Sequence, residues 1–172
     1  MCHGVTIRRL TAEDAPTLQG ISTEARKRYR NIPELNYVAD TPPVAHDRFE
    51  AGSGWVAETE IGILGYALMK PVDNQMFLDN ISTRPEAQGM GVGSRLMALV
   101  LRSATELGFN AVALTTFQAP PWNGPWFRRF GFTPIPASEI GSELAGIIER
   151  QAQYLDPRQR ETLWRPLSRS NE

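Results

Sequence analysis

Hydrophobic residues recur at helical spacing in two long stretches of the chain. After Gly91 they stand at Val92, Leu96, Leu99, Val100, Ala104 and Leu107. These steps of three and four predict an amphipathic helix over 91–107, with Gly108 as its C-terminal cap. The same spacing predicts another helix that runs from Ala15 to about Tyr29, preceded by a capping box at Thr11–Asp14.

Short apolar or alternating runs, bounded by glycine, proline or asparagine, predict the strands. They are Val5–Leu10, Trp55–Glu60, Ile63–Val72, Met76–Thr83, Ala111–Phe117, Gly131–Ile135 and Glu161–Leu167. Shorter helices are predicted over Ala45–Ala51, Trp126–Phe130 and Ser138–Tyr154, and an irregular loop over Asn31–Pro43. This order of elements predicts a single mixed α/β domain over residues 1–172, with a hairpin-built first half and crossover helices in the second.

Composition and charge narrow the class of protein. The chain has 172 residues, of which 41% are hydrophobic and 22% charged, as is ordinary for a soluble globular domain. Eighteen Lys and Arg against 19 Asp and Glu leave no basic excess of the kind that binding to nucleic-acid phosphates usually requires. No apolar stretch approaches the roughly 20 residues of a membrane helix, and no signal peptide is evident. We expect a cytoplasmic protein without nucleic-acid or membrane partners.

The cysteine and histidine content argues against metal sites and histidine-based triads. Cys2 is the only cysteine, so an intramolecular disulfide and a cysteine-based zinc site are excluded. His3 and His46 are the only histidines, which argues against a histidine-rich metal centre and a Ser-His-Asp triad. We expect no metal, and Cys2, beside a terminus that should fray, is not expected to act as a nucleophile.

A glycine-rich stretch, Gln88-Gly-Met-Gly-Val-Gly93, joins a predicted strand to the helix over 91–107. Backbone N–H groups at a helix start have no partner inside the helix and carry partial positive charge, so they bind phosphates. The stretch lacks the Gly-Lys-Ser/Thr of a Walker A loop and the spacing of a dinucleotide fingerprint. A plain strand-to-helix turn is the alternative, but three alternate glycines favour a phosphate loop.

The pattern of Gln88, Gly91 and Gly93 resembles the acetyl-CoA pyrophosphate loop of the GNAT superfamily of N-acetyltransferases. Downstream, Pro121-Trp-Asn-Gly-Pro-Trp-Phe-Arg-Arg-Phe-Gly-Phe132 looks like the segment that follows the fifth strand in one branch of that superfamily. The resemblance spans about residues 5–167. It implies a mostly antiparallel central sheet of six to seven strands, flanked by helices and splayed between strands 4 and 5.

The resemblance also implies acetyl-CoA as co-substrate. The pantetheine arm would lie along the fourth strand, and the pyrophosphate would bind to the glycine-rich loop. The implied cofactor-binding residues are Ile81, Ser82, Thr83, Gln88, Gly89, Met90, Gly91, Val92, Gly93, Ser94, Asn123 and Phe127. The acceptor is expected to be an amine of a small molecule or peptide, and the protein a monomer or a homodimer.

Catalysis in this family often uses a carboxylate on the fourth strand to take the proton from the amine, and Asp79 stands at a matching position. Strand alternation would put Asp79 and Asn80 on opposite faces, and we expect Asp79 to face the reacting groups. An ordinary strand residue is the alternative for Asp79.

The family's usual general acid is a tyrosine, but its position is taken by Phe127, which has no hydroxyl. Two hypotheses therefore stay open, an N-acetyltransferase and a non-catalytic acyl-CoA-binding sensor. A nucleotide-binding module is a third and weaker hypothesis.

Overall fold

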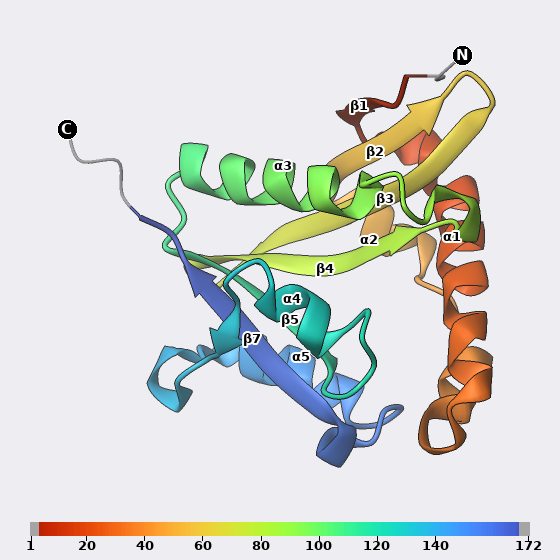
Figure 1. Ribbon diagram of the computed structural model, residues 1–172. Coiled ribbons are helices and arrows are strands. Elements are labelled where there is room, and N and C mark those ends of the chain that lie inside the picture. The colour runs from red at the N-terminus through yellow and green to blue at the C-terminus, as the bar shows by residue number, and fades with distance from the viewer. Residues whose placement is uncertain (1–3, 169–172) are drawn as a thin grey trace. The chain divides into compact units, whose positions relative to one another are not determined.

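The structure is a computed structural model that describes residues 4–168 (Figure 1). Cys2 and His3 lie outside the described residues. The strands are β1 (Thr6–Arg9), β2 (Ser53–Thr59), β3 (Gly62–Val72), β4 (Gln75–Thr83), β5 (Ala111–Phe117), β6 (Thr133–Pro134) and β7 (Arg160–Pro166). The helices are α1 (Ala15–Arg26), α2 (His46–Ala51), α3 (Val92–Glu106), α4 (Gly124–Arg128) and α5 (Ser142–Gln151).

The seven strands form one mixed sheet in the order β1-β2-β3-β4-β5-β7-β6. The pairs β1–β2, β2–β3, β5–β7 and β6–β7 are antiparallel, whereas β4 and β5 are parallel. The ladder between β4 and β5 contains only Met76 with Val112 and Phe77 with Ala113. The predicted fold class, a mixed and mostly antiparallel sheet flanked by helices, is confirmed, and the splay between β4 and β5 stays a prediction.

Local structure differs from the sequence prediction in several places; the predicted helix over Ser138–Tyr154, for example, is only Ser142–Gln151. The first helix ends at Arg26 and continues as a 3₁₀ turn over Lys27–Asn31, and the predicted loop contains a 3₁₀ helix over Pro33–Asp40. In the latter helix Leu35 and Val38 are buried, at the three-residue period of 3₁₀ geometry. Strand β6 is only Thr133–Pro134, because proline cannot donate to a ladder.

Contacts divide the chain into two compact units. The first comprises Met1–Lys70 with Leu78–Arg102, and the second comprises Pro71–Phe77 with Ser103–Glu172. Each unit has a hydrophobic cluster of its own. The prediction of a single domain over 1–172 stays a prediction.

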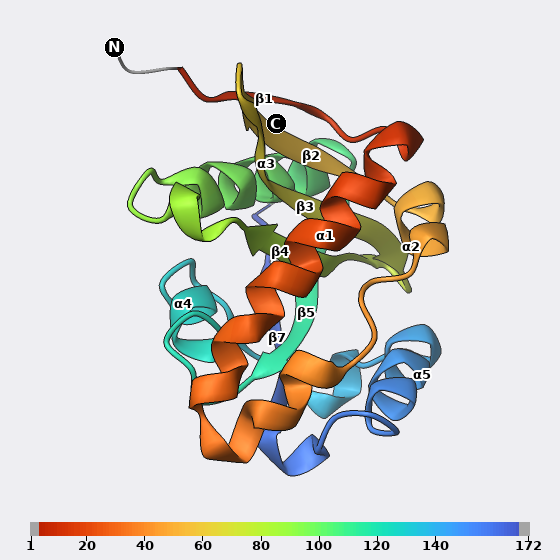
Figure 2. The ribbon, with the colours of Figure 1, turned by 90° about the vertical axis from the view of Figure 1, so that its right-hand side faces the viewer.

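In the first unit, α1 and α2 pack on one face of β2 and β3. The buried cluster there includes Leu18 and Ile21 of α1 and Phe49 of α2. The Phe49 ring meets Tyr66 of β3 edge to face, with centroids 5.5 Å apart. Helix α3 lies on the other side of the strands from α2 (Figures 1 and 2). The side of the sheet that faces α1 and α2 is therefore separate from the side that faces α3.

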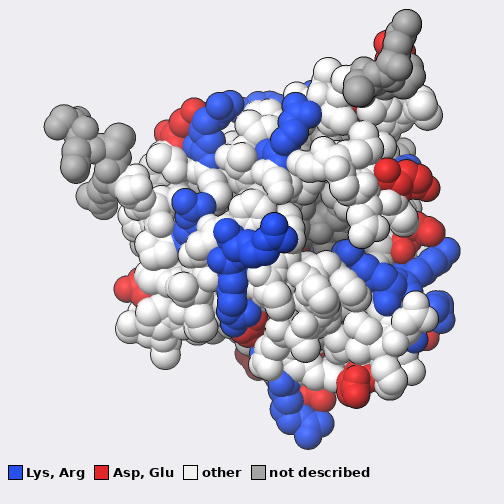
Figure 3. Space-filling model, viewed as in Figure 1, with Lys and Arg blue, Asp and Glu red and all other residues white. Residues whose placement is uncertain are grey.

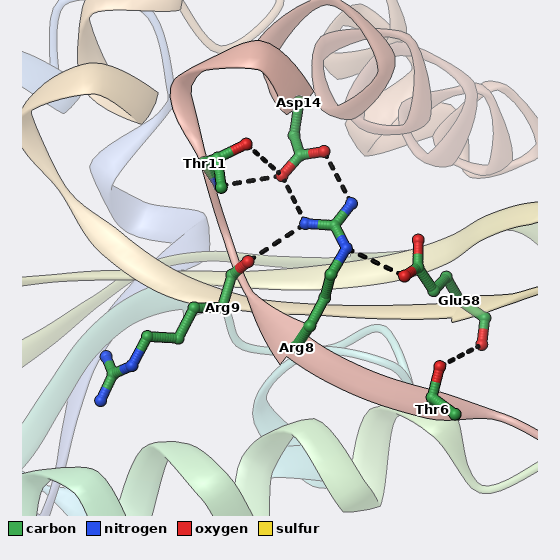
Figure 4. Close-up of polar contacts among 6 residues, drawn as sticks. All are labelled: Thr6, Arg8, Arg9, Thr11, Asp14 and Glu58. Carbon is green, nitrogen blue, oxygen red and sulfur yellow. Dashed lines mark hydrogen bonds and ion pairs between the residues drawn. The ribbon is translucent and has the colours of Figure 1, made fainter.

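A polar network ties β1 to the start of α1 and to β2 (Figure 4). The Arg8 guanidinium donates to both carboxylate oxygens of Asp14, at 2.9 and 2.8 Å, and to Glu58 at 2.9 Å. The Asp14 carboxylate also accepts from the Thr11 amide at 2.8 Å, which confirms the predicted capping box. The Arg8 hydrogen bond is the main reason why the pKa of Asp14 lies below its ordinary value.

The lowered pKa of Asp14 makes folding depend on pH. Because the folded pKa is depressed, the stabilisation is present above the pKa of the unfolded chain and is lost as pH falls through the lower folded value. We expect Asp14→Asn to lower the free energy of unfolding by about 1 kcal/mol at neutral pH, and by much less once pH falls below the usual aspartate range. Urea unfolding across that pH range measures the difference. Asp40→Asn is the control, because Asp40 forms an exposed pair with Arg30 and should change stability little.

In the second unit, hydrogen bonds connect the turn between β3 and β4 to the start of α5. Asp73 has a left-handed φ of 54°, and its carboxylate accepts from the amides of Glu143 and Leu144 at 3.2 and 3.1 Å. The Asp73 amide in turn donates to the Glu143 carboxylate at 2.8 Å. A Cβ at Gly141 would lie 2.4 Å from the Asp73 side chain, so this close approach requires glycine. The turn thus caps a helix 70 residues downstream.

Candidate functional site

The glycine-rich loop between β4 and α3 has an unusual backbone. Gly89 and Gly91 have φ values of 81° and 72°, in the left-handed region that favours glycine. A Cβ at either position would meet nothing within 4 Å, so glycine is needed for conformation, and the space beside the loop is open. The first helical hydrogen bond, from the Arg95 amide to the Gly91 carbonyl at 3.1 Å, marks the start of α3. The amides of Val92, Gly93 and Ser94 precede that bond and are therefore the orphan donors at the helix start.

The side chains of this loop divide into exposed and buried groups. Gln88, Gly89, Met90, Gly91 and Ser94 are exposed, and Gly93 is half-buried. Val92 is only 2% exposed, so its side chain is not available to a ligand. Backbone N–H groups at the start of α3 are suited to bind an anion, and the predicted contact of this loop with a pyrophosphate stays a prediction.

The predicted cofactor residues of β4 lie in the same unit as the loop. Ile81 and Thr83 are half-buried, and both stand beyond the short β4–β5 ladder, which ends at Phe77. Ser82 is 8% exposed, and its hydroxyl donates to Asn80 at 2.8 Å. Ser82 is thus engaged within the protein, and the contact of Ile81 and Thr83 with a cofactor stays a prediction.

Asp79, the predicted proton acceptor, forms a bidentate ion pair with Arg48 of α2. The Arg48 Nη2 and Nε atoms donate to the two carboxylate oxygens at 2.6 and 3.0 Å. The Asp79 side chain is only 5% exposed, against 37% for Arg48. Burial lowers the pKa of Arg48, but its hydrogen bond to Asp79 and the attraction between the charges outweigh burial and raise it. The pair ties α2 to β4.

Asn80 does not point away from Asp79, and the expectation of opposite faces is wrong. Its Oδ1 accepts from the Tyr66 hydroxyl at 2.7 Å, and Tyr66 packs against Phe49 of α2. Asp79 also reaches α2, so both side chains lie on the side that α1 and α2 cover. Two consecutive residues on one side require a break in strand alternation, as at a β-bulge. Burial raises the pKa of Tyr66 to about 12, so this phenol is neutral near pH 7.

Asn123 and Phe127 belong to the second unit. Asn123 is half-buried and is the N-cap residue of α4, where its carbonyl accepts from the Phe127 amide at 3.1 Å. The Phe127 ring is 6% exposed and packs edge to face against Trp126 and Phe132, with centroids 5.1 and 6.0 Å away. Both residues have a structural role in their unit, and their predicted contact with a cofactor stays a prediction.

Sequence reasoning missed Arg48 and Tyr66, which organise the polar side of β4. A carboxylate at a mostly buried strand position, such as Asp79, needs a charged or hydrogen-bonding partner. This requirement was the one sequence signal that could have predicted a basic partner. The sequence has 18 Lys and Arg residues, and nothing in the chain order selects Arg48 among them. Only packing of α2 against the sheet does so.

Within residues 4–168, no helix has both the length and the apolar character to cross a membrane. The same residues contain no group of three or more His, Cys, Asp or Glu side chains placed to hold a metal ion. On the face drawn in Figure 3, basic side chains form several separate groups, with uncharged or acidic surface between them.

Comparison with known proteins gives consistent matches. The sequence profile of the "Acetyltransferase (GNAT) family" matches residues 17–132. The "Probable N-acetyltransferase camello" of Xenopus laevis is 34% identical over 65 residues, which are 36% of this chain and 30% of that protein. The matched region is thus under a third of that relative's length.

Solved structures share the fold. An acetyltransferase of the GNAT family from Staphylococcus aureus Mu50 matches with a TM-score of 0.70 and 16% identity, over 96% of this chain and all of that chain. The N-acetylglutamate synthase of Neisseria gonorrhoeae, solved with coenzyme A and N-acetyl-glutamate, matches with a TM-score of 0.69 and 19% identity. That match covers 96% of this chain and 36% of the synthase.

Proposed function

Because this chain belongs to the GNAT family of acetyltransferases, we propose that it is an acetyl-CoA-dependent N-acetyltransferase that transfers the acetyl group directly to an amine. The neutral amine nitrogen attacks the thioester carbonyl carbon, so a C–N bond forms as the C–S bond breaks. The nitrogen gives up one proton, and the coenzyme A sulfur leaves as a thiolate that takes up a proton from water. A thiol pKa of about 8.5 makes this leaving group tolerable without a tyrosine at position 127.

The observation that carries the proposal is the backbone of the glycine-rich loop. Left-handed Gly89 and Gly91 lead directly into a 15-residue helix whose first amides lack helical partners. The helix dipole adds positive character at this end, so the loop suits the pyrophosphate of acetyl-CoA. Backbone groups of Ile81 and Thr83, in the same unit, would pair with the pantetheine amides as an added strand does.

Asp79 is our candidate for accepting the amine proton. Arg48 fixes the direction of the carboxylate, and each carboxylate oxygen keeps a lone pair for one more hydrogen bond. A base that is held in place needs less reorganisation when the proton moves.

A sensor that binds acyl-CoA without turnover is the second candidate, favoured by the absence of a hydroxyl at Phe127. One assay separates the two: release of free thiol from acetyl-CoA across a panel of small amines, amino acids and short peptides. We expect amine-dependent release. No release with any amine, while acetyl-CoA still raises the melting temperature, would favour the sensor.

A further inference from the structure

Arg26, the last residue of α1, is a half-buried cation held only by neutral oxygens. Its Nη1 donates to the carbonyl of Thr41 at 3.1 Å, to the Thr41 hydroxyl at 3.3 Å and to the carbonyl of Pro42. These bonds use one nitrogen of the guanidinium. The Nε–Nη2 edge carries three further N–H groups, and none of them takes part in these bonds.

Arg26 shares this with Arg84 and Arg95, which also donate to backbone carbonyls, but it differs from three other arginines of the same unit. Those pair with carboxylates: Arg8 with Asp14, Arg30 with Asp40 and Arg48 with Asp79. Among residues 4–168, no carboxylate pairs with Arg26. Burial is the main reason why its pKa lies below the ordinary value, and the positive charge of Arg48 lowers it further. A desolvated cation without a counter-ion is unfavourable, and an anion that binds beside it would remove that cost.

The surroundings of Arg26 include the polar side of β4. Both Arg48 and Tyr66 act electrostatically on the Arg26 guanidinium. Arg48 in turn holds Asp79, and the Tyr66 hydroxyl donates to Asn80. Asp79 pairs with Arg48, whereas no carboxylate of residues 4–168 pairs with Arg26.

Asn80 adds a donor to the same region. Its Oδ1 accepts from both Tyr66 and Ser82, at 2.7 and 2.8 Å. Because both partners donate to the oxygen, the Nδ2 group keeps its two N–H donors for another acceptor. The region thus combines one unpaired cation with an amide donor, beside the strand that carries Asp79.

We propose that the acceptor amine also carries a carboxylate, and that Arg26 binds this carboxylate through its Nε–Nη2 edge. The inference rests on the proposed function and names the substrate class of that enzyme. The planar guanidinium edge of Arg26 matches the two oxygens of a carboxylate. Amino acids and peptides with a nearby carboxylate have this chemistry, whereas simple alkylamines do not. Arg26 is then a specificity-determining residue.

Matched acceptors test the inference. Thiol release is measured with amino acids and with their carboxamides, and kcat/KM is expressed per neutral amine so that differences in amine pKa cancel. We expect at least about a tenfold preference for the carboxylate form, which corresponds to roughly 1.4 kcal/mol. Arg26→Gln should remove this preference, because it should raise KM for the amino acids. KM for acetyl-CoA and kcat/KM for the carboxamides should stay unchanged.

Two further variants make the result specific. Arg30→Gln removes a nearby positive charge that already pairs with Asp40, and it should keep the preference. Arg26→Lys keeps the charge without the guanidinium edge, and it should retain part of the preference. It also replaces Arg26→Gln if loss of the Thr41 contacts prevents folding of that variant.

Equilibrium binding separates failure of this inference from failure of the proposed function. A rise in melting temperature with amino acids that Arg26→Gln abolishes supports the inference even if no amine is acetylated. If the wild-type protein acetylates amino acids and their carboxamides equally well, the inference about Arg26 is wrong, whereas the proposed N-acetyltransferase function is supported. Turnover and binding both absent would overturn the two proposals together.

Discussion

Replacing Asp79 by asparagine is expected to lower kcat for acetyl transfer about 100-fold, the lower range for loss of a general base. KM for acetyl-CoA should stay nearly unchanged, because the glycine-rich loop that would bind the pyrophosphate lies elsewhere in the unit. The reason for the loss is that the amide oxygen of asparagine is a far weaker proton acceptor than a carboxylate. Steady-state kinetics of thiol release measures both constants, with the best amine from the panel.

The ion pair with Arg48 requires a control, because Asp79→Asn also removes a mostly buried charge pair. Breaking one partner of a buried pair leaves the other charge uncompensated and destabilises the protein. Arg48→Gln breaks the same pair and keeps the carboxylate, so it should lower the melting temperature similarly while kcat falls much less. If the two variants lose kcat equally, Asp79 serves only to hold α2 on β4, and the proton leaves by another route.

Replacing Gly91 by alanine is expected to raise KM for acetyl-CoA about tenfold, with a smaller change in kcat. Gly91 has a φ of 72°, where a side chain costs about 1–2 kcal/mol. The backbone will relieve this strain by rotating, which turns the first amides of α3 away from the bound phosphates. A free energy of about 1.4 kcal/mol corresponds to a tenfold change in affinity. The strain of a side chain at Gly91 is of this size, so it is enough to account for the expected rise in KM.

Gly108→Ala is the matched control for this variant. Gly108 follows the other end of α3 with a similar φ of 82°, and a Cβ there also meets nothing within 4 Å. The two substitutions should therefore cost similar stability, which thermal unfolding measures. Only Gly91→Ala should weaken the binding of acetyl-CoA and so raise its KM. An equal change in KM for both variants would trace the effect to general loosening of α3 and would contradict a phosphate role for the loop.

Much of the fold was readable from local pattern. The seven strands and the amphipathic helix over 91–107 lie close to their predicted positions, because burial of one face imposes a period that the residue order records directly. The glycine-rich loop was readable for a related reason, since a left-handed backbone restricts Gly89 and Gly91 to one residue type. The 3₁₀ helix over Pro33–Asp40 was missed because its three-residue period is short and begins with proline.

The sequence by itself determined the class of fold, the glycine-rich loop before the helix over 91–107, and the absence of a tyrosine at position 127. Tertiary structure alone decided which polar side chains meet: Arg48 with Asp79 across 31 residues, and Tyr66 with Asn80 across 14. It also put Asp79 and Asn80 on one side of the strand, where alternation predicted two. The physical reason is that backbone period and glycine conformation are local properties of the chain. Ion pairs, breaks in alternation and an unpaired cation such as Arg26 depend on which elements pack together.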